Sequence, residues 1–290
     1  MTACAIGKFD ALHRGHFALV ERAATLGQPV VVTFSDMANV LGWEQRLPLV
    51  APIDRVRILH EWSQQLKTTV RLAEIPFATV RHLSPTDFVA HLRQHLDATS
   101  VIVGEDFRFG HNRSGDVTAL RQQMTAHGGN AAIVAPVCHD HETISSSRVR
   151  AALLSGDMDT VSALLGRPHR VIGTVVHGEG RGKKIGFPTA NLGTCLNQVP
   201  AIGVYAAWAI LGNKRFPAAV NIGHLPTISG ERPLTIEAHF IDWKGDCYGQ
   251  ALGIDLIQRV RGEHRFATLD ALVQQIQSDV TLIRNLLAAG

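Results

Sequence analysis

Residues 7–16 read GKFDALHRGH and stand between a short apolar run and a segment whose apolar residues keep helical spacing. The string is therefore predicted to be a turn from a β-strand into an α-helix. A helix N-terminus offers unpaired backbone N–H groups and partial positive charge, and imidazole N–H groups beside it suit phosphate oxygens. His13 and His16 are accordingly predicted to contact a phosphate, and Gly15 between them lets the backbone approach.

Two alternatives apply to the same histidines. Zinc would need at least a third protein ligand, and none lies near them in the sequence. A single histidine in a turn is ordinarily structural, but the complete ten-residue string favours a binding site.

The rest of the first half alternates β-branched runs with amphipathic helices, which predicts a parallel sheet covered on both faces, with ligands at the carboxyl ends of the strands. One helix is expected from about Asp54, and another begins with Ser84 as N-cap and Pro85 in its first turn. The strands are predicted at residues 30–34, 101–103 and 132–134.

Two further segments of this half carry polar groups where ligands are expected. Residues 104–110, GEDFRFG, leave the end of a predicted strand. Residues 144–150, ISSSRVR, gather hydroxyls and arginines at the start of a helix, which indicates a second anion site. Ser147 can equally be no more than the N-cap of that helix.

The sequence pattern changes after residue 166. Helices and strands alternate before it, and short strands separated by glycine and proline follow it. Strands at such spacing predict a small barrel. A final helix is expected from Leu269, with Thr268 as its N-cap. The predicted fold is α/β: a Rossmann-like N-terminal domain at residues 1–166, and a small antiparallel β-barrel with a terminal helix at residues 167–290.

Residues 177–191 read HGEGRGKKIGFPTAN, a loop whose glycines permit a tight backbone cradle for phosphate and whose lysines add charge. The glycine spacing matches neither a P-loop nor a dinucleotide-binding fingerprint. Thr189 and Asn191 lie two residues apart, so in an extended segment both side chains point the same way and can hold one Mg²⁺ with nucleotide phosphates. A flexible basic loop is the alternative.

In the predicted strand at residues 234–240, the apolar residues alternate to one face and leave Thr235, Glu237 and His239 on the other. Glu237 is therefore either a functional carboxylate or a glutamate exposed to solvent.

The overall composition excludes several classes of protein. The chain has 290 residues, 46% hydrophobic and 18% charged, with a formal net charge of +3, so it can bury a core and nothing demands a nucleic-acid or membrane partner. The four cysteines lie far apart, which argues against a zinc site or a disulfide framework. No apolar run is long enough for a transmembrane helix and the start lacks the pattern of a signal peptide, so a cytoplasmic location is expected.

Segments 7–16, 104–110 and 144–150 together resemble the nucleotidyltransferase superfamily that carries a His-x-Gly-His motif and an Ile-Ser-Ser-Thr-like motif. The resemblance implies in-line adenylyl transfer, in which an acceptor phosphate attacks the α-phosphorus of ATP, with His13 and His16 stabilising charge. The ATP contacts that it implies are Gly7, Phe9, Asp10, Gly15, Ser145, Ser146, Ser147 and Arg150, and the loop for FMN and ATP is Gly104, Asp106, Phe107 and Arg108.

The second half looks like the riboflavin kinase family in its PTAN string at residues 188–191, the glycine-rich loop before it, and residues 221–223, 226–227 and 246–249. Together the two halves make the chain similar to the prokaryotic bifunctional riboflavin kinase/FAD synthetase family. This resemblance implies that riboflavin is phosphorylated to FMN in the barrel and FMN is adenylylated to FAD in the N-terminal domain with release of pyrophosphate, using ATP as substrate and Mg²⁺ as cofactor.

Residue roles in the barrel follow from the same resemblance. Glu237 would be the general base on the ribityl 5′-hydroxyl, and Thr189 and Asn191 would hold the metal. Arg261 and Phe266 match the C-terminal segment that closes over flavin. The implied ATP contacts are Gly180, Gly182, Lys183, Lys184, Thr189 and Asn191, and the implied flavin contacts are Gly186, Phe187 and Arg261.

One departure concerns residues 35–38, where the family usually has Glu-Pro, then His or Gln, then Pro, and this chain reads SDMA. Adenylylation is therefore expected to be the weaker activity. Ser147 in place of the usual Thr keeps the hydroxyl. Two alternatives stay open: a riboflavin kinase with a weakened or altered adenylyltransferase domain, and a non-enzymatic flavin- or nucleotide-binding regulator.

Overall fold

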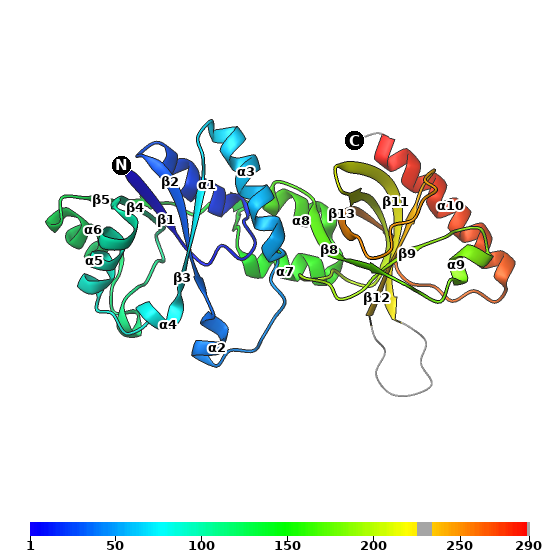
Figure 1. Cartoon of the computed structure of the whole chain (residues 1–290), viewed down its shortest axis with the longest axis horizontal. Helices are drawn as coiled ribbons and strands as arrows, with labels where there is room; N and C mark the ends of the chain where they lie inside the picture. The colour runs from blue at the N-terminus through cyan, green and yellow to red at the C-terminus, as the bar shows by residue number, and fades with distance from the viewer. Residues whose placement is uncertain (225–233, 289–290) are drawn as a thin grey trace. The chain divides into compact units, whose positions relative to one another are not determined.

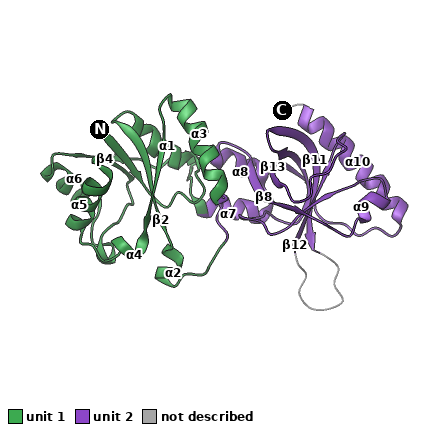
Figure 2. Cartoon of the chain, viewed as in Figure 1, with its two compact units in different colours: residues 1–46, 52–146 green, residues 47–51, 147–290 purple. Residues whose placement is uncertain are grey.

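The computed structural model describes residues 1–224 and 234–288 (Figure 1). The chain forms two compact units (Figure 2): the first contains residues 1–46 and 52–146, and the second contains residues 47–51 and 147–290. Pro226 and Thr227, which belong to the resemblance above, lie outside the described residues.

The first unit is built on a parallel five-stranded sheet of order β3-β2-β1-β4-β5, which confirms the predicted class. The strands are β1 (Thr2–Ile6), β2 (Gln28–Ser35), β3 (Arg71–Pro76), β4 (Ala98–Gly104) and β5 (Asn130–Val134). The central strands are nearly continuous apolar runs because helices bury both of their faces. The short antiparallel pair β6 (Cys138–His139) and β7 (Glu142–Thr143) stands apart from this sheet.

Helices cover the two faces of the sheet. Cys4 and Ile6 of β1 pack in one cluster with Leu92 of α5 (Pro85–Leu96) and Leu120 of α6 (Val117–Ala126), while α1 (Arg14–Ala24) packs against β1, β2 and β4. The predicted cap of α5 is confirmed, because the Ser84 hydroxyl accepts a hydrogen bond from the Asp87 N–H at 3.1 Å. The helices of this unit are α1 (Arg14–Ala24), α2 (Met37–Leu41), η1 (Pro52–Asp54), α3 (Arg55–Leu66), α4 (Phe77–Val80), α5 (Pro85–Leu96), η2 (His111–Arg113) and α6 (Val117–Ala126).

The second unit is a closed six-stranded barrel of order β10-β11-β12-β9-β8-β13, in which neighbouring strands are antiparallel. This confirms the predicted barrel. Its strands are β8 (His169–Val176), β9 (Ala190–Leu192), β10 (Gly203–Leu211), β11 (Lys214–His224), β12 (Leu234–Phe240) and β13 (Ala251–Arg261). A single helical turn, α9 (Arg181–Lys184), lies inside the glycine-rich loop.

The terminal helix α10 (Leu269–Ala288) closes one side of the barrel. Ile283 and Leu287 pack with Val204 of β10 and Ile241, so one outer face of the barrel is buried under the helix. Thr268 is the N-cap, as predicted, since its hydroxyl accepts a hydrogen bond from the Ala271 N–H at 3.2 Å. α10 also packs against β11, one of the strands that carry the polar row described below.

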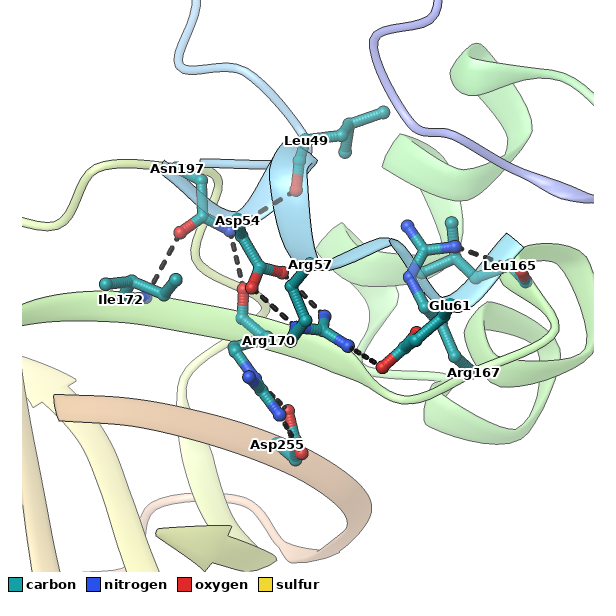
Figure 3. A network of polar contacts seen from close by, with 10 residues as sticks. All are labelled: Leu49, Asp54, Arg57, Glu61, Leu165, Arg167, Arg170, Ile172, Asn197 and Asp255. Carbon is teal, nitrogen blue, oxygen red and sulfur yellow. Dashed lines mark hydrogen bonds and ion pairs between the residues drawn. The ribbon is translucent and has the colours of Figure 1, made fainter. Parts of the chain in front are cut away.

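A buried amide fastens the segment 47–51 to the barrel (Figure 3). Asn197 is 0% exposed, and its Nδ2 group donates to the carbonyl oxygens of Leu49 at 3.2 Å and Arg170 at 2.8 Å. Its Oδ1 atom accepts from the Ile172 N–H at 3.2 Å. Full use of the amide compensates for its burial, so this short segment is a structural part of the second unit.

The structural units divide the chain between Ser146 and Ser147, earlier than the expected boundary at residue 166. The two helices α7 (Ser146–Ser155) and α8 (Met158–Leu165) lie between the observed and the expected boundary. They group with the second unit because α8 packs against β8 and β13 of the barrel. Assignment of the two activities to residues 1–166 and 167–290 stays a prediction.

None of the described helices combines the length and the apolar character needed to cross a membrane. The four cysteines all lie in the described residues as free thiols, and burial raises the pKa of Cys4 to about 12 and that of Cys195 to about 11. Buried thiols of this kind are held protonated and unreactive.

Candidate active sites

The two histidines of the first motif lie together at the start of α1. His13 is the N-cap, and its Nδ1 atom accepts a hydrogen bond from the His16 N–H at 3.2 Å. The rings stack with centroids 3.7 Å apart and planes inclined by 11°. Because Nδ1 of His13 accepts, the proton of a neutral ring is on Nε2, which is then a donor. The turn thus combines an imidazole donor with helical N–H groups, as an anion site requires.

Local backbone geometry holds this arrangement in place. Phe9 has a φ of 48° and is 1% exposed, and its ring lies 4.7 Å from that of His16. A Cβ added to Gly15 would lie 3.1 Å from the ring of His13 and 3.7 Å from the carbonyl oxygen of Ile144. A side chain at position 15 would therefore crowd the ring of His13, at the point where the ISSSRVR segment approaches the turn.

The motif sits at the topological switch point of the sheet. The chain passes from β1 to β2 and β3 on one side, and β4 and β5 then add on the other side of β1. Ligands of open α/β sheets bind in the crevice outside the carboxyl ends of the strands at such a point. The turn after β1 and the predicted loop after β4 both leave this edge, so the topology brings segments 7–16 and 104–110 to one place.

The loop after β4 is ordered by its own contacts. The Phe107 N–H donates to the carbonyl of Gly104 at 3.2 Å, and Asp106 lies close enough that a Cβ added to Gly104 would meet its Oδ1 atom at 3.2 Å. Arg108 pairs with Asp116 at 3.3 Å. The pKa of Asp116 is lowered, first by the backbone N–H of Ala119, which this carboxylate caps.

The predicted ATP contacts of the ISSSRVR segment fall on both sides of the unit division. Ser145 and Ser146 belong to the first unit, whereas Ser147 and Arg150 belong to the second. The Arg150 guanidinium donates to the carbonyl of Leu47 at 3.1 Å and to the side chain of Gln198 at 2.8 Å. A structural role for Arg150 therefore stands beside the predicted role in ATP binding.

The predicted residues of the kinase meet through strand register. Asn191 of β9 pairs with Glu237 of β12, and Glu237 pairs with Asn221 of β11. Directly opposed residues on neighbouring antiparallel strands share a face, so the three side chains form a polar row across the barrel. The Thr189 hydroxyl donates to Oε2 of Glu237 at 3.4 Å. Four oxygen-bearing side chains thus gather at one place, and hard oxygen ligands of this type suit Mg²⁺.

The glycine-rich loop folds closely over this row. A Cβ at Gly178 would collide with the Asn191 side chain, and one at Gly182 would collide with the carbonyl of Phe187. Gly180 and Gly186 have φ values of 67° and 90°, which favour glycine. Lys183 and Lys184 are exposed on α9, and they give the loop the positive charge expected for phosphate.

A cavity of about 300 Å³ lies between the end of β13 and α10, lined by Arg261, Gly262, Glu263, His264, Phe266 and Gln275. Arg261 and Phe266, both singled out in the sequence, therefore line the same space, while Gly186 and Phe187 are outside its lining. A Cβ at Gly223 would lie 3.5 Å from Nδ2 of Asn221 and 3.1 Å from the carboxyl carbon of Glu263. The cavity is thereby linked to the polar row.

Sequence reasoning missed two groups of this region. Asn221 was quoted only as part of a motif, and nothing in its local spacing shows that it lies beside Glu237. Asp279, 5% exposed, accepts from the Arg261 guanidinium at 2.7 Å and from Gln275 at 2.8 Å. The sequence did contain a signal for Asp279, since its carboxylate lies on the apolar side of the predicted terminal helix. A charge in that position needs a buried partner.

Comparison with known proteins gives two matching family profiles. The riboflavin kinase profile matches residues 165–287, and the FAD synthetase profile matches residues 1–148. The first match covers the barrel and α10, and the second covers the parallel sheet. Each set of site residues described above therefore lies within one matched region, except that Arg150 falls just beyond the end of the FAD synthetase match at residue 148.

Relatives at the level of the whole chain are bifunctional. The bifunctional riboflavin kinase/FMN adenylyltransferase of Pseudomonas fluorescens is 35% identical over 295 residues, which cover 98% of this chain and 92% of the relative. The protein of the same description from Escherichia coli (strain K12) is 36% identical over 283 residues, covering 94% and 89%. A crystal structure of a Streptococcus pneumoniae protein named as a macrolide-efflux protein matches with a TM-score of 0.85 at 28% identity, covering 98% of this chain and 94% of the other.

Proposed function

The chain belongs to the family of bifunctional riboflavin kinase/FMN adenylyltransferases, and from this premise we propose how its residues divide the work. It is a transferase that phosphorylates riboflavin to FMN and adenylylates FMN to FAD, with ATP as the substrate of both steps. The observation that carries the division is that each unit contains its own cluster of predicted site residues, at the switch point of the sheet and on the polar row of the barrel.

In the kinase step, Glu237 accepts the proton of the ribityl 5′-hydroxyl as that oxygen attacks the γ-phosphorus of ATP. The bond from the γ-phosphorus to the bridging oxygen breaks, and ADP leaves. The Glu237 carboxylate lies beside Thr189 and between Asn191 and Asn221. These three neighbours hold it in one orientation. A base within hydrogen-bond reach of the hydroxyl contributes typically about 100- to 10,000-fold to such a step.

Thr189 and Asn191 hold Mg²⁺ in this proposal, because both offer neutral oxygen atoms next to a carboxylate. When bound, the ion would neutralise phosphate charge. The backbone of residues 178–186 and the exposed lysines of α9 wrap the phosphates, and Arg261 with Phe266 holds the flavin at the cavity beside α10.

In the adenylyl step, a phosphate oxygen of FMN attacks the α-phosphorus of ATP and pyrophosphate leaves. His13 and His16 donate hydrogen bonds to phosphoryl oxygens, and the N-terminus of α1 adds its partial positive charge. The protein supplies positioning and charge stabilisation here, and no group of the enzyme is covalently modified. The loop at residues 104–110 closes the other side of the crevice.

Chromatography of flavins tests this function directly. Purified protein is incubated with riboflavin, ATP and Mg²⁺, and the products are separated over time. FMN that appears first and FAD that follows it is the expected result. FMN alone would leave a riboflavin kinase with an inactive adenylyltransferase unit, and no product at all would favour a flavin-binding regulator.

A further inference from the structure

His239 lies on the same face of β12 as Glu237, and the steps described above leave it without a role. Its Nδ1 atom is 2.8 Å from the carbonyl oxygen of Pro188. A carbonyl oxygen only accepts hydrogen bonds, so Nδ1 carries a proton and donates it here. The distance is that of an ordinary N–H···O hydrogen bond. A side chain of β12 therefore holds the residue that comes just before Thr189.

This hydrogen bond lies where the backbone pairing between β9 and β12 ends. The register of the two strands stops at the pair Ala190 and Ala238. Proline has no N–H group, so Pro188 cannot donate to a neighbouring strand. His239 follows Ala238, and its side chain makes the connection that the backbone no longer makes. The segment that leads into β9 is thus fastened to β12.

Pro188 joins two parts of the kinase site. On one side of it, the Phe187 N–H donates to the carbonyl of Gly182 at 2.8 Å, which folds the end of the glycine-rich loop back on itself. On the other side is Thr189, whose hydroxyl is 3.4 Å from Oε2 of Glu237. That distance is long for an O–H···O hydrogen bond, so this contact alone holds Thr189 weakly. The bond from β12 to Pro188 therefore fixes both parts relative to the strand that carries the proposed base.

The ring of His239 makes a second contact, which has to be separated from the hydrogen bond. It meets the Phe187 ring nearly at a right angle, with centroids 5.4 Å apart and planes inclined by 75°. A packing role would depend on this aromatic contact, whereas a positioning role depends on the Nδ1–H donor. Because the two roles need different atoms, substitutions can separate them.

We propose that His239 is a positioning residue of the riboflavin kinase step, which holds Pro188 so that Thr189 and the glycine-rich loop stay in place beside Glu237; this rests on the proposed function. In this role His239 touches neither riboflavin nor ATP. Partners that orient the ligands of a metal typically contribute about 10- to 100-fold to activity. Loss of the donor should therefore lower turnover and leave riboflavin binding in place.

Two substitutions remove the ring and the donor separately. In His239→Asn, the amide carries an N–H group at the same number of bonds from the backbone as Nδ1, but the ring is lost. In His239→Phe, the ring remains and the donor is lost. We expect kcat of FMN formation to fall by about 10- to 100-fold in His239→Phe, with the KM for riboflavin nearly unchanged, and to stay near that of the wild type in His239→Asn. A packing role would give the reverse order, and that order would overturn the proposal.

Hydrogen exchange of the ligand-free protein gives a second readout, which needs no turnover. Peptides that cover residues 179–190 should exchange faster in His239→Phe than in the wild type or in His239→Asn, because the loop loses its connection to β12. Peptides from β10, β11 and β13 should be unchanged, which reports that the barrel is folded. Unchanged exchange of residues 179–190 in folded His239→Phe would overturn the proposal. If His239→Phe does not fold, His239→Asn decides: lowered turnover and faster exchange in that variant would contradict the role of the donor.

His127 provides a matched control. Its Nδ1 atom also donates to a backbone carbonyl, that of Gln123 at 2.8 Å, but at the end of α6 in the first unit. His127→Phe should leave FMN formation unchanged. Wild-type protein that makes no FMN would contradict the proposed function itself, whereas normal turnover in His239→Phe would contradict only the role of His239.

Discussion

The two units gather their predicted phosphate-binding groups in different ways. In the first, the groups come from one ten-residue turn, where His13 caps α1 and stacks on His16. In the second, Asn191, Glu237 and Asn221 come from three strands and meet only through register. The first site therefore depends on local backbone geometry, and the second depends on the closure of the barrel. Changes at one should leave the other intact.

The largest effect is expected for Glu237→Gln. The amide cannot accept the proton of the ribityl hydroxyl, so kinase turnover should fall by about 100- to 10,000-fold while the KM for riboflavin changes little. Initial rates of FMN formation at several riboflavin concentrations measure both quantities.

Thr235→Ala is the control for that change. Thr235 lies two residues earlier on the same face of β12, and its hydroxyl donates to the carbonyl of Gly223 at 3.2 Å. It should retain most of the turnover. Near-normal turnover in Glu237→Gln would return this carboxylate to the role of a solvent-exposed strand residue.

His16→Ala is expected to lower FAD formation by about 100-fold or more, the typical cost of one preorganised donor at a developing charge, and to spare FMN formation. His13→Ala should act in the same direction and also remove the cap of α1. His60→Ala, an exposed histidine of α3, serves as the control. Metal analysis accompanies these assays: stoichiometric zinc in the wild type that His16→Ala loses would replace the phosphate contact with a metal site.

Much of the fold could be predicted because its signals are local. The helix starts at Ser84 with Pro85 and at Thr268 were predicted correctly, since capping depends on the residues at the helix terminus. β3 was missed because it is an edge strand with little buried surface, and β9 because it has three residues.

The two candidate sites also differ in how far their residues lie from one another along the chain. The histidine turn could be recognised as a site from the sequence because its chemistry lies within residues 7–16. The partners of Glu237 could not be derived from spacing, since Asn191 and Asn221 are far from it along the chain and only register joins them. The ion pair between the partly exposed Arg261 and the buried Asp279 likewise could not be predicted, because it forms only when α10 packs on the barrel.

The smallest change in kinetics is expected at residues 35–38, where the chain departs from the sequence usual in the family. Asp36 has a φ of 57° just before α2. Proline cannot adopt this angle, so the Glu-Pro sequence usual in the family would require a different turn here. Asp36→Asn is a more specific test than introducing Glu-Pro, because asparagine tolerates the left-handed region and the substitution removes only the negative charge.

The KM for ATP in FAD formation should fall by about 2- to 5-fold in Asp36→Asn, since an exposed charge is largely screened by salt. The effect should shrink as ionic strength rises, and riboflavin phosphorylation should not change. An unaltered KM at low salt would show that this departure is neutral for ATP use.

The central claim is that the two activities belong to separate units, and Asn191→Ala tests it most directly. The variant is assayed twice by flavin chromatography, once with riboflavin and ATP and once with FMN and ATP, both with Mg²⁺. Loss of a side chain proposed to hold the metal should lower FMN formation by about 100-fold or more, with FAD formation from supplied FMN nearly unchanged. Equal loss of both activities in a folded variant would contradict the account.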